Sequence, residues 1–351
     1  MFEMDIQNNL LVRYPAEANM LKHALTGDIK AAKRILYYLS SSNPILCQIM
    51  QKAIHDLRDS HIWYMLLRHL SWHQWDEYID SDQQFGLDGS ERIDQSIIEV
   101  FTQDDHEWEK AEKETTLLAN INDPDSMIQQ ACAYLLALRG YPMVIPVLAD
   151  TIKNGTRKWQ LRAIKALETL NDERSARPLL MALTMNRDEL HREACRALNN
   201  LGSLAKSAWI EALDHSDNQI RWEAARGLGQ IGDARAVDIL AGGLLNESYS
   251  VRWATSDALA HLGTQAIPAI LTILSQHKLN EPSCNTAFHA LHGILSASTQ
   301  EHIEPLLDAL RGPAPDIEVP VIARHLLLDW ETTDEITSKN MQESTRIEKI
   351  I

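Results

Sequence analysis

The chain has 351 residues, of which 45% are hydrophobic and 23% charged, and its formal net charge is −16. This much apolar material predicts a globular or repeat protein with one large core or two ordinary ones. A protein that neutralises nucleic-acid phosphates clusters Lys and Arg on one face, so the acidic balance disfavours nucleic-acid binding and favours a basic partner.

The first residues, "MFEMDIQNNLLVRYPAEANM", contain neither a basic start nor the apolar run of a signal peptide. No later segment approaches eighteen uninterrupted apolar residues, so we expect a cytoplasmic protein that does not contact a membrane. Four cysteines are scattered without a Cys-x-x-Cys pair, which predicts neither a disulfide nor a zinc site. They are Cys47, Cys132, Cys195 and Cys284.

Residues 1–115 are predicted to form a separate helical N-terminal region, either a cap or diverged repeats, because amphipathic helical patterns occur there outside the later register. Between Asp76 and Glu114 the chain carries 14 acidic and 3 basic residues. We expect this acidic segment to be a solvated loop or insertion; the alternative is a docking strip for a basic partner.

A leucine recurs at nearly constant spacing through the rest of the chain, within similar phrases such as "RGLGQIG" and "DALAHLG". Successive leucines are separated by 32, 31, 30, 31 and 32 residues. They are Leu135, Leu167, Leu198, Leu228, Leu259 and Leu291. This period predicts six stacked units over 116–335, with a degenerate seventh near Leu327 and a tail over 336–351.

Within each unit, apolar residues recur at spacings of three and four residues in two successive stripes. This pattern predicts a pair of helices, a helical hairpin. Glycines such as Gly232 and Gly263 follow the first stripe, where a residue with positive φ ends a helix. Prolines are expected in the first turn of the second helix. They are Pro146, Pro178, Pro268 and Pro305. One hairpin cannot bury both apolar faces alone, so the units must stack.

The phrase "IRWEAARGLGQIGDARAVDIL" resembles the HEAT repeat, specifically the short bacterial type named after phycobilin lyases. The resemblance is close over 218–275, good over 155–217 and weaker over 122–154 and 279–335. It implies an all-α, right-handed α-solenoid whose second helices line a concave surface. It implies no single activity, because this repeat serves mostly as a scaffold.

Two Arg-Trp pairs, Arg221-Trp222 and Arg252-Trp253, lie one repeat apart. In one interpretation they contact a partner peptide, since Arg and Trp dominate interface hot spots. In the other, each Arg bridges to an acidic residue of the preceding turn, such as Asp217, while each indole packs on the next hairpin.

Aligning the second helices on their prolines predicts an apolar row that projects from the packed stripe and could receive a helix or extended peptide. The candidate partner-binding residues on these helices are Leu179, Ala182, Trp209, Glu211, Ile239 and Gly242. The alternative is that the helical phase is shifted by one residue and that the row is buried between repeats.

The sequence shows no phosphate loop, no nucleophile elbow and no Ser-His-Asp order, and neither histidine cluster, around His69 or around His289, has a complete metal-ligand set. We therefore expect no catalytic residues, no metal and no cofactor. The hypothesis is a non-enzymatic scaffold that binds a protein or peptide along its concave face. The alternative that the resemblance leaves open is a phycobilin-lyase-like enzyme or cofactor chaperone.

Overall fold

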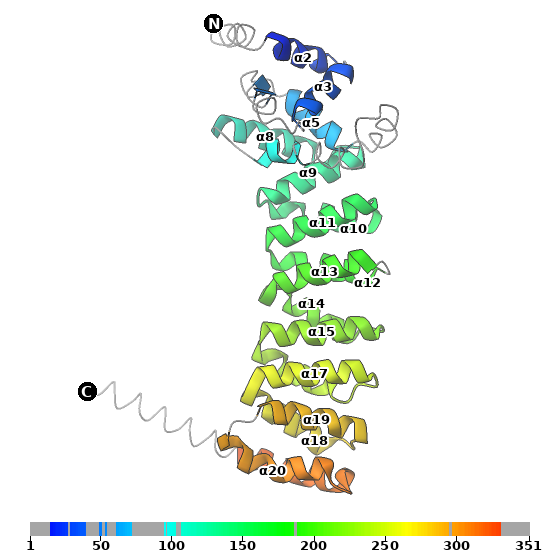
Figure 1. The fold of residues 1–351 in the computed structure, drawn as a ribbon, viewed down its shortest axis with the longest axis vertical. Helices are drawn as coiled ribbons and strands as arrows, with labels where there is room; N and C mark the ends of the chain where they lie inside the picture. Colours follow the sequence, from blue (N-terminus) through cyan, green and yellow to red (C-terminus); the bar gives the residue numbers. More distant parts are fainter. Residues whose placement is uncertain are drawn as a thin grey trace, which may run out of the picture. The chain divides into compact units, whose positions relative to one another are not determined.

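The computed structural model describes the chain as a series of helices (Figure 1), with no strand in the described parts. The described residues are 15–26, 29–39, 49–50, 53–54, 61–71, 95, 97–102, 107–185, 188–294 and 297–330. The predicted tail, 336–351, lies outside them. Contacts divide the chain into two compact units, Met1–Asn171 and Asp172–Ile351.

The first unit includes seven α-helices whose bounds the structure describes, and two of the last three carry the repeating leucine. They are α2 (Pro15–Leu25), α3 (Ile29–Leu39), α5 (His61–Ser71), α8 (Glu107–Asn120), α9 (Ser126–Leu138), α10 (Ile145–Asn154) and α11 (Arg157–Leu170). Helix α8 runs across the predicted boundary at residue 115. The described parts of the acidic segment, 97–102 and 107–114, are helical, so the expectation of a loop is wrong there.

Within the second unit, successive helices lie side by side (Figure 1). They are α12 (Ala176–Thr184), α13 (Asp188–Asn200), α14 (Lys206–Leu213), α15 (Asn218–Ile231), α16 (Val237–Gly243), α17 (Tyr249–Leu262), α18 (Ile267–Gln276), α19 (Glu281–Ile294) and α20 (Ala297–Arg311), followed by a helix over 315–330. First helices contact first helices, as α15 and α17 do, while α16 contacts α18. This two-layer stacking buries both faces of each hairpin.

The predicted hairpins are confirmed, because the six repeating leucines fall on α9, α11, α13, α15, α17 and α19 and all are fully buried. The chain turns between the helices of a hairpin at Gly232 and Gly263, whose φ angles of 69° and 72° are strained for any other residue. Pro146 and Pro268 open their helices as expected. Pro305 instead lies inside α20, so its predicted place in a first turn is wrong.

An Asp-x-Arg sequence fixes two of the hairpin corners. Asp172 and Asp233 each cap the short 3₁₀ turn that follows and pair with Arg174 and Arg235 at 2.7 and 2.8 Å. Lys206 of the preceding hairpin also donates to Asp233 at 3.0 Å. The side-chain hydrogen bond from Arg235, with help from Lys206, holds the pKa of Asp233 well below its usual range. The carboxylate therefore links consecutive repeats while charged.

The segment Tyr249–Gln276 is the one stretch of the described residues whose length and composition would suit a membrane span. It is not one continuous helix, because the chain reverses at Gly263 between α17 and α18. More than half of its most apolar window is buried inside the protein. Packing between repeats accounts for its hydrophobicity.

Candidate functional site

The apolar row predicted on the second helices is not continuous. Leu179 and Ala182 are fully buried on α12, so their expected exposure is wrong. Trp209, which fits either interpretation of the row, is fully buried on α14. These side chains are buried between helices. This is the outcome expected if the helical phase is shifted by one residue, the alternative interpretation of the row. Glu211, Ile239 and Gly242 are exposed, but they lie on two different helices and form no apolar row with the others.

The two arginines of the Arg-Trp pairs are held by the turns that precede their own helices. Arg221 Nη1 donates to the carbonyl of His215 at 2.7 Å, and Arg252 Nη1 donates to the carbonyl of Asn246 at 2.7 Å. Each arginine thus binds the preceding turn through carbonyl oxygens, and the expected acidic acceptor, Asp217 for Arg221, is wrong. Both guanidinium groups are largely buried and stabilise the turns between repeats.

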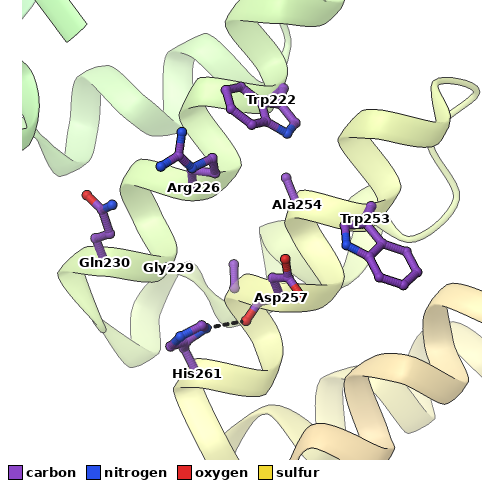
Figure 2. A pocket seen from close by; sticks show the side chains of 9 residues that line it. Trp222, Arg226, Gly229, Gln230, Trp253, Ala254, Asp257 and His261 are labelled. Carbon is purple, nitrogen blue, oxygen red and sulfur yellow. Dashed lines mark hydrogen bonds between the residues drawn. The ribbon is translucent and has the colours of Figure 1, made fainter. Parts of the chain in front are cut away.

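The two tryptophans, by contrast, line a pocket of about 350 Å³ between α15 and α17 (Figure 2). Its two walls are rows of side chains at four-residue spacing, which places each row on one side of its helix. The rows are Trp222, Arg226 and Gln230 on α15, and Trp253, Asp257 and His261 on α17. Trp222 and Trp253 occupy equivalent positions of successive repeats. The same position of the repeat therefore places one tryptophan on the α15 wall and one on the α17 wall.

Small residues lie between these rows and bring the two helices close together. A Cβ atom at Gly229 would lie 2.7 Å from the Cβ of Ala258 and 2.8 Å from its Cα. Neither atom can move without shifting the backbone of α17. The missing side chain at Gly229 therefore sets the separation of the pocket walls.

We expect Gly229→Val to lower the free energy of unfolding by about 1–3 kcal/mol, because the added methyl groups overlap Ala258. The matched control is Gly242→Ala on α16, where an added Cβ meets nothing within 4 Å. That change should raise stability by about 0.5–1 kcal/mol through helix propensity. Urea unfolding followed by circular dichroism measures both; equal midpoints for the two variants would contradict this account of the packing.

Arg226 lies against the indole of Trp222. Its guanidinium carbon is 4.6 Å from the ring centroid of Trp222, within the range of a cation–π contact. Its ion pair with Glu223 is long, at 3.9 Å. The Glu223 carboxylate is largely buried and accepts from Cys195 Sγ at 3.2 Å and from Gln219 Nε2 at 3.3 Å. Arg226 thus faces the pocket with its charge only weakly compensated.

On the opposite wall, Asp257 and Trp253 are both held by His289 of α19. Asp257 Oδ1 lies 2.8 Å from His289 Nε2, and the His289 ring stacks on Trp253 at 4.4 Å between centroids. Tyr249 stacks on the same indole at 6.0 Å. His261 Nδ1 lies 2.7 Å from the Asp257 carbonyl, drawn as the dashed line in Figure 2. These contacts orient the wall before any ligand binds.

Two cysteines of the described residues, neither of which lines the pocket, have raised pKa values. Burial, reinforced by the nearby Glu223 carboxylate, raises the pKa of the Cys195 thiol to about 12. Burial likewise raises the pKa of the Cys132 thiol to about 12. Both thiols are therefore protonated at neutral pH, and a protonated thiol is a poor nucleophile.

No group of three His, Cys, Asp or Glu side chains within the described ranges is placed to hold a metal ion. The cluster around His289 does not converge: His289 is bonded to Asp257, and His292 stacks on Phe288 at 5.5 Å. Cys284 is buried.

Sequence reasoning selected Trp222 and Trp253 but missed four other polar side chains of the pocket. These are Arg226, Gln230, Asp257 and His261. A signal was available, because each follows one of the two tryptophans by four or eight residues and so shares its helical face.

The sequence profile of HEAT repeats matches residues 114–202 and 206–278. These residues are HEAT repeats. They include the whole of α15 and α17, so the pocket lies between two HEAT repeats.

A curated relative of this chain is phycocyanobilin lyase subunit alpha from Picosynechococcus sp. (strain ATCC 27264 / PCC 7002 / PR-6). The two are 29% identical over 167 residues, which cover 41% of this chain and 60% of the relative. The chain therefore matches less than two thirds of that relative's length.

Solved structures similar to this chain include importin beta, with 15% identity, a TM-score of 0.37, and coverage of 88% of this chain and 47% of importin beta. An engineered protein is 17% identical with a TM-score of 0.36, and the match covers 93% of this chain and 98% of the engineered protein. A second engineered protein is 22% identical with a TM-score of 0.30, and the match covers 52% of this chain and 96% of that protein.

Proposed function

We propose that this protein is a non-enzymatic cytoplasmic scaffold that binds a protein or peptide partner, and that the partner contacts the pocket between α15 and α17. The observation that carries the proposal is the pair of tryptophans at equivalent repeat positions, lining an open pocket between helices held close together. Trp side chains in well-packed pockets supply much of the binding energy of protein interfaces. The stacking of HEAT hairpins provides the rigid frame that such a contact requires.

The test is a pull-down from the native cytoplasm that compares the wild-type chain with a Trp222→Ala, Trp253→Ala double variant. Truncation of a hot-spot residue costs about 2 kcal/mol or more, so we expect partners to be lost from the double variant. The matched control is Ile239→Ala, which removes an exposed apolar side chain from the second-helix layer. Circular dichroism establishes that all three proteins are equally helical.

Loss of a partner from the double variant but not from Ile239→Ala supports the pocket. Loss from Ile239→Ala alone would place the contact on the second-helix layer. An unchanged set of partners in both variants would contradict the proposal.

The similarity to phycocyanobilin lyase subunit alpha supports a second candidate, an enzyme or cofactor chaperone that acts on a bilin. This candidate predicts absorbance above the protein band in the protein purified from its native cells. A colourless protein that also develops no band on addition of phycocyanobilin would count against it.

A further inference from the structure

The chemistry of the pocket walls indicates which kind of peptide fits. Arg226 is the exposed cation of the site: its side chain is 47% exposed, and its guanidinium carbon lies 4.6 Å from the centroid of the Trp222 ring. A guanidinium presents parallel N–H donors, the geometry that a carboxylate accepts.

The carboxylate nearest in sequence does not satisfy this cation. Glu223 is 12% exposed, and its two oxygens accept from Cys195 and Gln219. The 3.9 Å separation from Arg226 is beyond hydrogen-bond distance. An incoming carboxylate could therefore approach Arg226 from the solvent side without displacing an internal hydrogen bond.

Further donors line the rest of the walls. Gln230 lies one helical turn beyond Arg226 on α15, and its side-chain amide carries two N–H donors (Figure 2). In the part of the chain that the structure describes, neither the Trp222 nor the Trp253 indole N–H donates to a protein atom. These groups suit a ligand rich in oxygen acceptors.

Asp257 is the carboxylate of the pocket and lies on the wall opposite Arg226. One of its oxygens, Oδ1, is held by His289 Nε2 at 2.8 Å. The other can accept a hydrogen bond from the backbone N–H of a peptide. The pocket thus combines a site for a side-chain carboxylate, at Arg226, with an acceptor for a backbone N–H, at Asp257. A peptide can fill both, whereas a free anion cannot.

We propose that this pocket binds an acidic peptide segment of the partner, in which an Asp or Glu carboxylate pairs with Arg226 and an adjacent apolar side chain packs on Trp222 and Trp253. This proposal rests on the protein-binding function proposed above and adds the chemical class of the ligand. It differs from the basic partner that the net charge of −16 favours. That long-range charge is screened beyond about 8 Å in physiological salt, whereas the contact at Arg226 acts at hydrogen-bond distance.

The test uses the full-length chain and a library of 12-residue peptides in which one central position is fixed as Glu, Asp, Gln, Lys or Arg and the others are varied. Wild type should retain the Glu and Asp pools about tenfold more strongly than the Lys and Arg pools, as expected for a charge-assisted hydrogen bond. Arg226→Glu should abolish or reverse this preference. The matched control is Arg177→Glu, the same change of charge at an exposed residue of α12 outside the pocket, which should keep the wild-type preference.

Arg226→Gln, which removes the charge without adding one, should reduce the preference to within about twofold, provided its circular dichroism spectrum matches wild type. Wild-type selection of the Lys and Arg pools, or equal retention of all pools, would overturn the proposal. So would an acidic preference that survives Arg226→Glu. If a cellular partner is lost from the Trp222→Ala, Trp253→Ala variant but not from Arg226→Glu, the scaffold function stands and the acidic-peptide inference fails.

Discussion

Leu179→Glu is expected to remove a large part of the stability of the second unit, because it places a charge where the side chain is fully buried. A buried, unpaired carboxylate costs more than about 4 kcal/mol, a large fraction of the stability of an ordinary domain. We expect a lower helical signal and an earlier urea transition, both measured by circular dichroism.

Ile239→Glu is the matched control for this prediction. Ile239 is 42% exposed on α16, so the same substitution should change stability by no more than about 0.5 kcal/mol. A Leu179→Glu protein with the wild-type urea midpoint would show that α12 does not pack as described. An Ile239→Glu protein that loses its helical signal would show the same for α16.

Trp209→Ala is expected to be the second most damaging of the substitutions considered, with a loss of about 3–5 kcal/mol. The indole is fully buried and lies where a side chain at Gly227 would be, since a Cβ there would fall 2.6 Å from two indole atoms. Truncation leaves a cavity between α14 and α15 that neither backbone can close. Thermal unfolding and urea unfolding both measure the loss.

Trp209→Phe provides the control for this cavity. Its ring keeps most of the packing and removes a buried indole N–H that has no hydrogen-bond partner. We expect it to cost less than about 1.5 kcal/mol. A Trp209→Phe protein as unstable as Trp209→Ala would mean that the size of the side chain is not what stabilises this contact.

The repeat architecture could be predicted from the sequence because its signals are local and recur. The buried leucine, such as Leu228, and the glycine with positive φ that ends the same helix, Gly232, occur at fixed offsets in several units. Each repetition confirms the others, so one diverged unit does not obscure the pattern.

The exposure of the second helices could not be predicted in the same way. Pro178 is the third residue of α12, whereas Pro146 and Pro268 are the second residues of α10 and α18, so aligning these helices on their prolines places α12 one residue out of phase. Leu179 and Ile239 were therefore assigned the same environment, although one is buried and the other exposed. Periodicity alone does not distinguish the face that meets the next repeat from the face that meets solvent.

Only the two tryptophans of the pocket could be predicted from the sequence, for a different reason. Trp222 and Trp253 drew attention as a repeated pair, but the pocket also depends on Gly229, whose role follows from its distance to Ala258 in another repeat. The weak compensation of Arg226 likewise depends on Glu223 being bonded to Cys195 of the preceding repeat. Contacts between repeats join residues about 30 positions apart, which no local pattern reports.

The most direct test of the proposed function is site-specific photocrosslinking in the native cytoplasm. A photoreactive amino acid is placed at Gln230, an exposed residue of the pocket wall, or at Ile239, an exposed residue of the second-helix layer. The account predicts a discrete crosslinked partner from position 230 that disappears when Trp222 and Trp253 are replaced by Ala, and none from position 239. Crosslinking from position 239 alone, or crosslinking from position 230 that persists without the tryptophans, would contradict it.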